Sequence, residues 1–359
     1  MDRYKIIRPA TNESFADALA SVLSGLSDHL TAEKAQGREL VFVRFFLSDA
    51  QNQAPALREA MRTGNAGTGL PLWDTAQPFA RRGGICGGPY SIVEQPPLDG
   101  SRIAALVWTS AQADRYLFHS LRLTEEEAAG KSSYEQSRLL FDKYLGIIRP
   151  LGLDLKTHCI RTWIYVRDID SNYAGLVKAR NDVFTEEGLS HDTHYIASTG
   201  IGGANEVRSA VVAIDFLTAP SIVEEDKTYL KALSHLSPTH DYGVAFERGV
   251  RVKDHIFISG TASIDHKGRI LHEGDVLAQA DRLLENIRAL LTEGGLAGQA
   301  SVPYFIIYLR DIADYAKVDA YMQTRFPDTP RIILEARVCR PGWLIEMECE
   351  ASGCLSAVR

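Results

Sequence analysis

A carboxylic acid on an apolar strand is the first feature of this sequence that could do chemistry. Glu346 lies within the segment Leu344–Glu348, and the two-residue period of a strand puts Glu346 and Glu348 on the same face. Burial of that face would raise the pKa of the Glu346 carboxyl, which could then hold a proton near neutral pH and act as a general acid. The alternative is a solvent-facing edge strand with two ordinary glutamates.

Three arginines, Arg161, Arg331 and Arg340, lie in or beside predicted strands. A guanidinium that faces inward needs an anionic partner to offset its loss of water. Its planar fork suits a carboxylate, which it binds through two parallel hydrogen bonds. These arginines are therefore candidates for binding a small anionic substrate. The alternative for each is an ordinary ion pair with a neighbouring Asp or Glu.

A glycine-rich turn, Thr199-Gly200-Ile201-Gly202-Gly203, offers backbone N–H groups that can approach a ligand carboxylate or a water. It precedes a strand instead of opening a helix, so it is not a dinucleotide-binding fingerprint. Tyr195, just before the turn, either lines the pocket or simply packs. The histidines lack metal-ligand spacing and the five cysteines lack CxxC spacing. We therefore expect neither a metal nor another cofactor.

The elements that must position these residues recur along the chain. Each of three strands rich in β-branched and aromatic residues ends in Asp and precedes an amphipathic helix, and another amphipathic helix comes before each strand. The strands are expected at 40–49, 161–169 and 304–312, the helices after them at 53–61, 173–184 and 315–326, and the helices before them at 15–30, 133–148 and 276–291. Three such copies account for the length of the chain. The alternative is three unrelated strand–helix pairs.

Composition and charge narrow the class of protein. A chain of 359 residues exceeds the usual size of one core, so two or three packed units are expected. The net charge of −7 gives no basic footprint for nucleic acid. No signal peptide or membrane span is recognisable, which predicts a cytoplasmic protein. A glycine- and proline-rich segment at 64–97 is expected to form a long ordered loop.

The order of segments in the last third of the chain resembles the RidA/YjgF superfamily: Ile256–Ala262, Gly274-Asp275, Tyr304–Leu309, Arg331–Arg340 and Leu344–Glu348. Within that superfamily, Arg161-Thr162-Trp163, Ser198–Gly203 and Ser259-Gly260-Thr261 are similar to the chorismatases, over roughly residues 114–352. The resemblance implies an α+β fold of repeated units, each a mixed sheet with two helices on one face. The units would be 1–113, which is degenerate, 114–219, and 220–359 with an N-terminal connector.

Members of this superfamily form trimers with active sites between subunits, so the resemblance implies that one chain builds an internal pseudo-trimer. Its sheets would face inward and its helices outward. A competent site would form where the second and third units meet. The chain would act as a monomer or associate further into a homo-oligomer.

The resemblance also implies a reaction, cleavage of the enolpyruvyl ether of chorismate with release of pyruvate. Glu346 would protonate the enol ether, and Arg161, Arg331 and Arg340 would hold the two carboxylates of this dianion. The substrate pocket would further include Trp163, Tyr195, Thr199, Gly200 and Gly202.

The pair Gly260 and Cys339 marks the chorismatases that form 3-hydroxybenzoate, with the Cys339 thiol guiding the opening of an arene-oxide-like intermediate. The alternative for Cys339 is a small buried hydrophobic residue.

Two features depart from the chorismatase pattern. Asp265-His266-Lys267-Gly268 does not continue it, and Arg331 is more similar to the arginine by which RidA-type deaminases bind the substrate carboxylate. The second candidate is therefore an enamine or imine deaminase that uses Arg331 and Glu346. A third is a non-catalytic small-molecule sensor that keeps the fold.

Overall fold

The computed structural model describes residues 2–10, 12–63, 89–296 and 302–352. Most of the glycine- and proline-rich segment, residues 64–88, lies outside the described residues. No helix in the described ranges is long and apolar enough to cross a membrane.

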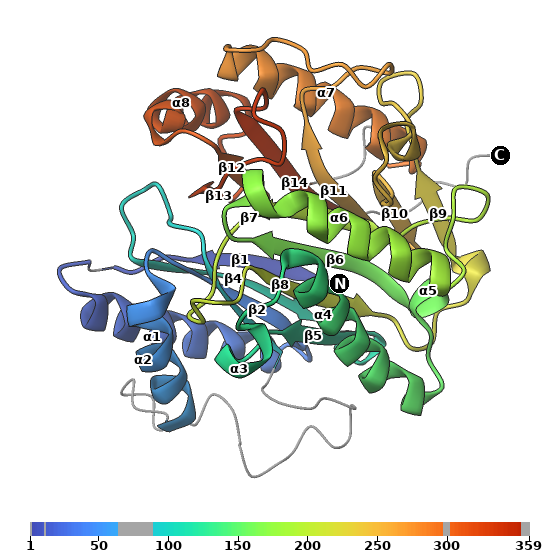
Figure 1. The fold of residues 1–359 in the computed structure, drawn as a ribbon. Coiled ribbons are helices and arrows are strands. Elements are labelled where there is room, and N and C mark those ends of the chain that lie inside the picture. The colour runs from blue at the N-terminus through green and yellow to red at the C-terminus, as the bar shows by residue number, and fades with distance from the viewer. Residues whose placement is uncertain (1, 11, 64–88, 297–301, 353–359) are drawn as a thin grey trace.

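Three sheets repeat one strand order, and we name the first, second and third units after them (Figure 1). The first is β1-β4-β2-β3, built from Arg3–Ile7, Ile103–Ser110, Glu39–Leu47 and Tyr90–Glu94. The second is β5-β8-β6-β7, from Leu117–Leu121, Val212–Thr218, Cys159–Val166 and Ala197–Gly202. The third sheet contains the same order as β11-β14-β12-β13, built from His255–Ala262, Ile345–Ser352, Phe305–Leu309 and Arg331–Glu335.

In each sheet the last two strands of this order pair in parallel and the others antiparallel. A parallel pair needs a crossover between its strands, and the helix after each predicted strand supplies it. These helices are α2 (Ala50–Thr63), α6 (Ile169–Glu186) and α8 (Tyr315–Arg325). The predicted α+β class with repeated units is confirmed.

The other long helices also match the predicted segments: α1 (Phe15–Lys34), α4 (Ser133–Ile148) and α7 (Val276–Glu293). Each begins at a residue whose side chain accepts a hydrogen bond from the first turn, namely Ser14, Ser132 and Asp275. Two short helices, α3 (Glu125–Ala128) and α5 (Leu155–His158), complete the second unit.

The helices lie on the outside of the molecule and the sheets lie inside (Figure 1). One apolar cluster joins the inner faces of all three sheets, with Trp108, Trp163 and Phe257 as large members. Equivalent backbone bridges hold the third unit to both neighbours, Val338 with Ile201 and Pro97 with Leu334. In each bridge, the segment that follows β13 or β3 pairs with the equivalent strand of the neighbouring unit, β7 or β13, respectively. A pseudo-threefold arrangement requires this repetition.

Two details of the third unit go beyond what the sequence predicted. The connector that precedes this unit carries a strand, β9 (Lys227–Leu230), which pairs with β10 (Gly249–Val252) and extends the sheet by a hairpin. Within the segment Arg331–Arg340, the strand ends at Glu335. The residues after Glu335 turn toward the second unit, where Val338 makes its bridge, and so they cannot continue β13.

Candidate active site

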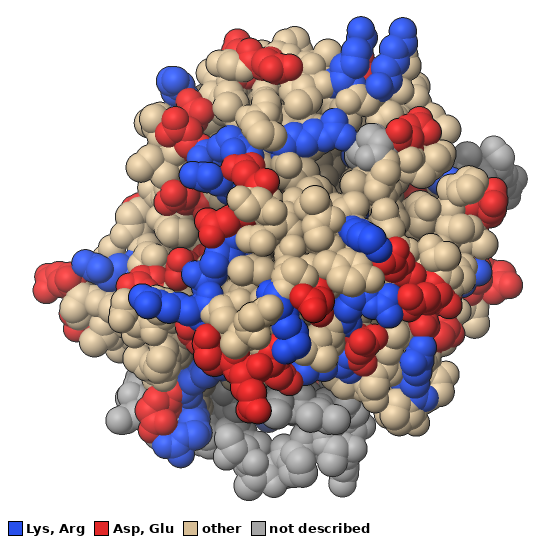
Figure 2. Space-filling view, in the orientation of Figure 1, with Lys and Arg blue, Asp and Glu red and all other residues tan. Residues whose placement is uncertain are grey.

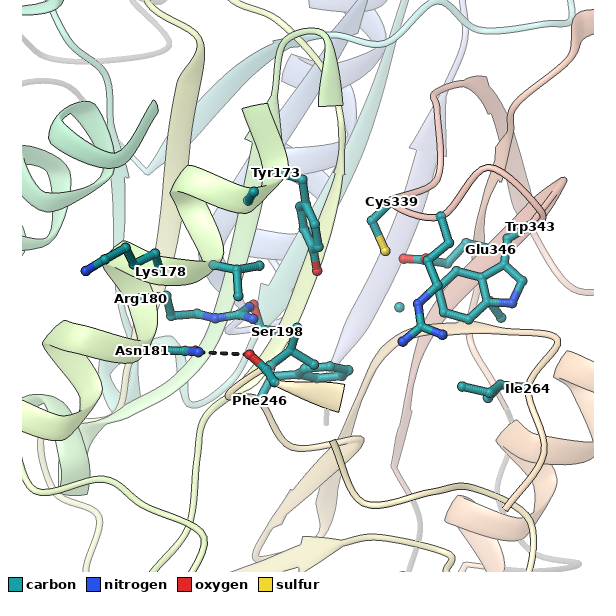
Figure 3. Close-up of a pocket in the computed structure, with 18 of the residues that line it drawn as sticks. Tyr173, Lys178, Arg180, Asn181, Ser198, Phe246, Ile264, Cys339, Trp343 and Glu346 are labelled. Atoms are coloured by element: carbon teal, nitrogen blue, oxygen red, sulfur yellow. Dashed lines mark hydrogen bonds between the residues drawn. The ribbon is translucent and has the colours of Figure 1, made fainter. Parts of the chain in front are cut away.

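A cavity of about 570 Å³ lies where the second and third units meet. The second unit contributes α6 and β7, and the third contributes β11, β14 and the segment after β13. The connector closes one side with residues around Phe246 and Arg248. Figure 3 shows Arg180 and Tyr173 on one side of this space and Glu346, Cys339 and Trp343 on the other.

Glu346 is the acidic group of the cavity that is set up to hold a proton. Glu346 projects from β14 and lines the cavity, and only 5% of its surface is exposed to solvent. Burial, with a further contribution from the charge of Glu348, raises the pKa of the Glu346 carboxyl to about 8. The carboxyl is therefore mostly protonated at neutral pH, as a general acid must be.

Gly260 makes room for this carboxyl. A Cβ atom added to Gly260 would lie 2.0 Å from Oε1 of Glu346 and 3.0 Å from a methyl carbon of Thr199. No side chain can be accommodated at such distances unless Glu346 moves. Glycine on β11 therefore lets the acid lie flat against the strand, and Gly260 itself also lines the cavity.

Only one of the three repeated units carries the acid. Phe46, Tyr165 and Tyr308 are equivalent in the repeat. Each lies three residues before the Asp at the end of its predicted strand, which is Asp49, Asp168 or Asp311. Their antiparallel partners are Ala104, Ala213 and Glu346, respectively. The acid thus faces the boundary between the second and third units, and an alanine takes its place at the other two boundaries.

Arg180 brings a buried positive charge to the cavity. It lies on α6 and is 1% exposed, and among the described residues its Nε and Nη2 atoms have no hydrogen-bond partner. Its guanidinium carbon lies 5.8 Å from the ring centre of Phe246. A buried guanidinium without an anion is costly, so this position calls for an anionic ligand.

Arg248 and Arg340 add two more cations to the wall. Arg248 donates to the carbonyl of Ser237 at 3.0 Å, and its guanidinium lies 5.3 Å from the ring of Phe246. The Arg340 guanidinium stacks over Trp343 at 4.8 Å. With Arg180, these side chains place three guanidinium groups around one space, which suits a ligand with more than one carboxylate.

The Cys339 thiol lines the same cavity, near Glu346 and Tyr173 (Figure 3). Loss of water raises the pKa of this thiol to about 12, with a further contribution from the nearby Glu346. Cys339 is therefore a neutral thiol at physiological pH and not a nucleophilic thiolate. The Tyr173 ring packs over Gly200, whose added Cβ would lie 3.3 Å from it.

Arg161 does not line the cavity, contrary to the expectation from the sequence. Its guanidinium is 2% exposed and donates to Glu348 at 2.8 Å and to the Thr199 hydroxyl at 2.6 Å. Trp163 donates to the other Glu348 oxygen at 3.0 Å. The ion-pair alternative therefore holds for Arg161, because Glu348, on the same face of β14 as Glu346, binds its guanidinium.

This buried network still supports the site from behind. The Thr199 hydroxyl accepts a hydrogen bond from the backbone N–H of Gly260 at 2.9 Å and itself donates to Glu348. Arg44 of the first unit lies 3.8 Å from Glu348. All three units thus hold the strand that carries the acid.

Three further residues that the resemblance placed in the substrate pocket lie outside this cavity. Tyr195 lines a smaller cavity beneath the connector and stacks on Phe184. Gly202 lies against the backbone of Arg337 and leaves no room for a side chain, since an added Cβ would lie 2.7 Å from the amide nitrogen of Arg337. Arg331 pairs with Asp319 at 2.7 Å and lines another cavity, at the boundary between the first and third units.

Sequence reasoning missed Arg180, Arg248 and Tyr173. A signal for Arg180 is present, because it falls on the apolar stripe of its helix with Leu176, Val183 and Phe184. A charged residue on a buried helical stripe is unusual and indicates a ligand or a buried partner. Arg248 lies in the connector, where no periodic pattern distinguishes it.

Comparisons with known proteins agree with this architecture. The family model described as Endoribonuclease L-PSP matches residues 238–352. A RutC family protein of Pyrococcus abyssi is 32% identical over 108 residues, which cover 30% of this chain and 84% of the relative. A 3-hydroxybenzoate synthase of Streptomyces hygroscopicus is 27% identical over 216 residues, 52% of this chain and 62% of the relative. A solved chorismatase structure superposes with a TM-score of 0.67 at 19% identity and covers 98% of both chains.

Proposed function

Since this chain belongs to the Endoribonuclease L-PSP family, within the RidA/YjgF superfamily, and shares its whole fold with a chorismatase, we propose that it is a chorismatase-like enzyme. The proposed reaction converts chorismate to pyruvate and 3-hydroxybenzoate. These two products together contain every atom of chorismate, so no other reactant is consumed. The observation that carries the proposal is a Glu346 carboxyl of raised pKa in one cavity with Arg180, whose Nε and Nη2 have no hydrogen-bond partner in the part of the chain that the structure describes.

The charges of the cavity suit the substrate. Chorismate has two carboxylates, and two units each contribute a guanidinium group to the cavity, Arg180 on α6 and Arg340 after β13. One carboxylate would bind the guanidinium of Arg180, two of whose nitrogen atoms lack a hydrogen-bond partner among the described residues. The remaining lining, including Val244, Phe246 and Ile264, is apolar enough to hold the ring and exclude water.

Glu346 would start the reaction by protonating the methylene carbon of the enol ether. The bond between the ring and the ether oxygen then breaks, and its electron pair leaves with pyruvate. The oxygen of the neighbouring ring hydroxyl then bonds to the electron-poor carbon that remains, which gives an arene-oxide-like intermediate, and the hydroxyl proton returns to the Glu346 carboxylate. Cleavage of the other C–O bond of this intermediate, with loss of the proton from the carbon that keeps the oxygen and protonation of that oxygen, would give 3-hydroxybenzoate. A carboxyl whose pKa is near 8 both gives and regains a proton at neutral pH.

Cys339 would act on the ring after the ether is broken. The neutral thiol faces the same space as Glu346, and it is small enough to let the ring approach. Its proposed role is to direct the ring intermediate toward 3-hydroxybenzoate instead of a dihydrodiol.

The deaminase alternative needs Arg331 and Glu346 in one site. Arg331 on β13 is the parallel partner of Phe305, and Ser198 on β7 is the parallel partner of Thr162. Because Phe305 and Thr162 are equivalent in the repeat, Arg331 and Ser198 hold equivalent positions. Arg331 therefore faces the first unit, while Glu346 faces the second. This separation favours the chorismatase proposal.

Incubation of the purified protein with chorismate tests the proposal. We expect pyruvate, measured by a coupled dehydrogenase assay, in equal amounts with 3-hydroxybenzoate, identified by chromatography. Ammonia release from an enamine would favour the deaminase. Saturable chorismate binding without turnover would favour a sensor. The Glu335→Gln variant, which changes an exposed residue on β13, serves as the matched control for Glu346→Gln.

A further inference from the structure

The acid Glu346 has a second buried carboxyl group as its neighbour, that of Glu348. The two residues lie on the same face of β14, where positions two residues apart are roughly 6.6 Å from each other. Both residues are buried. Two carboxyl groups that are this close and shielded from water cannot both ionise at low cost, so one of them keeps a proton. The neighbours of each group decide which one.

The neighbours of Glu348 favour its anion. Arg161 donates to it at 2.8 Å, Trp163 donates at 3.0 Å, and the Thr199 hydroxyl also donates. Arg44 of the first unit adds a second guanidinium 3.8 Å away. Guanidinium and indole groups can only donate, so a protonated carboxyl at this position would lose hydrogen bonds. The first and second units thus hold Glu348 as a carboxylate.

The neighbours of Glu346 leave it the proton of the pair. Its carboxyl lies against Gly260, which has no side chain, and close to the neutral thiol of Cys339. The charge of Glu348 acts on Glu346 more strongly than the charges of Arg161 and Arg248 do, and it raises the pKa of the Glu346 carboxyl. The other titratable and charged groups on this side are Tyr308 of β12, Tyr173, Lys178, Arg180 and Asp182 of α6, and Arg340 after β13.

We propose that Glu348 is a positioning residue of the proposed reaction, which keeps the proton on Glu346 until the substrate takes it and then promotes its return. This role presupposes the proposed function. Once the proton has passed to the methylene carbon of chorismate, two neighbouring carboxylates repel each other, which makes Glu346 a stronger base. Glu346 then accepts the proton of the ring hydroxyl. The pair therefore holds one proton at the start and at the end of each turnover.

The Glu348→Gln variant tests this role through the pH dependence of kcat for pyruvate release. Glutamine keeps the size of the side chain but removes its charge. We expect the fall of kcat, centred at about pH 8 in the wild type, to move to lower pH by about one pH unit or more. At pH 8 the variant should keep about a tenth or less of its own maximal rate, against about half for the wild type. A purely structural role would lower kcat at every pH without moving the midpoint.

Glu350→Gln is the matched control. Glu350 lies on the same face of β14, two residues further from Glu346, and is 3% exposed against 2% for Glu348. It accepts hydrogen bonds from Tyr304 at 2.9 Å and contacts the His255 ring nitrogen at 2.9 Å, so its loss also leaves buried polar groups unpaired. Glu350→Gln should therefore leave the midpoint of the pH profile unchanged. Glu348→Asp, which retains the charge, should return the midpoint toward that of the wild type.

Infrared titration without substrate gives a readout that does not depend on turnover. The carbonyl band of the protonated Glu346 carboxyl is identified by its loss in Glu346→Gln, and in Glu348→Gln it should disappear at a lower pH than in the wild type. Failure of the protein to turn over chorismate would refute the proposed function, whereas this band would still show whether Glu348 keeps the proton on Glu346.

A double variant covers the case in which Glu348→Gln does not fold. Arg161→Met combined with Glu348→Gln removes a buried cation and a buried anion together, so neither charge is left without its partner. Its band should still titrate at a lower pH, because Glu348 acts on Glu346 more strongly than Arg161 does. A midpoint that stays at the wild-type pH in the folded Glu348 variant, or one that Glu350→Gln moves equally, would overturn the proposal.

Discussion

The replacement Glu346→Gln tests the proposed acid most directly. Glutamine keeps the shape of the side chain but cannot transfer a proton to carbon. At pH 7 a carboxyl with a pKa of about 8 is roughly nine-tenths protonated, so nearly every wild-type molecule carries the acid. General acid catalysis contributes about 10²- to 10⁴-fold. We therefore expect kcat for pyruvate release to fall by that factor, equivalent to about 2.7–5.5 kcal/mol.

The pH dependence gives a second measurement on the same residue. The protonated acid is required, so kcat of the wild type should be constant below about pH 7 and fall as the pH rises through about 8. Wild-type turnover in Glu346→Gln, or a wild-type rate that does not fall above pH 8, would refute the assignment.

Stability supplies a readout that does not depend on turnover. Folding raises the pKa of Glu346 above its ordinary value of 4.5 to about 8, so the native chain holds a proton that the unfolded chain has lost. The contribution of this group to the free energy of unfolding is complete below pH 4.5 and is lost by about pH 8. In Glu346→Gln the urea midpoint should vary less over this interval than in the wild type. An identical pH profile for both proteins would mean that Glu346 is not buried as described.

Three other replacements separate the roles of binding, product choice and support. Arg180→Gln should raise the KM for chorismate by about 10- to 1000-fold with a smaller change in kcat, because it removes a buried partner of a ligand carboxylate; an unchanged KM would exclude Arg180 from the binding site. Cys339→Ala should keep pyruvate release and shift the ring product away from 3-hydroxybenzoate, as chromatography would show; an unchanged product would leave the thiol with a packing role alone. Arg161→Met should lower the free energy of unfolding by roughly 3–5 kcal/mol in urea titration, since it leaves Glu348 buried with its closest cationic partner removed; a loss below about 1 kcal/mol would contradict the ion-pair role.

The sequence by itself determined the repeated elements. Strand and helix periods are local properties, so the three strand–helix segments and the three helices before them were predictable close to their observed limits. The sequence also indicated Glu346, because a carboxyl on an apolar strand is unusual wherever the strand packs. In the other two units, Ala104 and Ala213 hold the positions equivalent to Glu346. The sequence alone does not show this equivalence, because it depends on how the strands pair in the folded chain.

Tertiary structure decided which charges meet. Arg161 is 187 residues from Glu348 in the chain, and no local pattern indicates that they form a buried pair. Arg331 and Glu346 lie 15 residues apart in the sequence. They nevertheless face different neighbouring units, because β12 separates β13 from β14 in the sheet. Arg180 and Glu346 come from different units and meet in one cavity only because the units close around a common core. The identity of the acid is thus local information, whereas its partners are set by the way three sheets pack together.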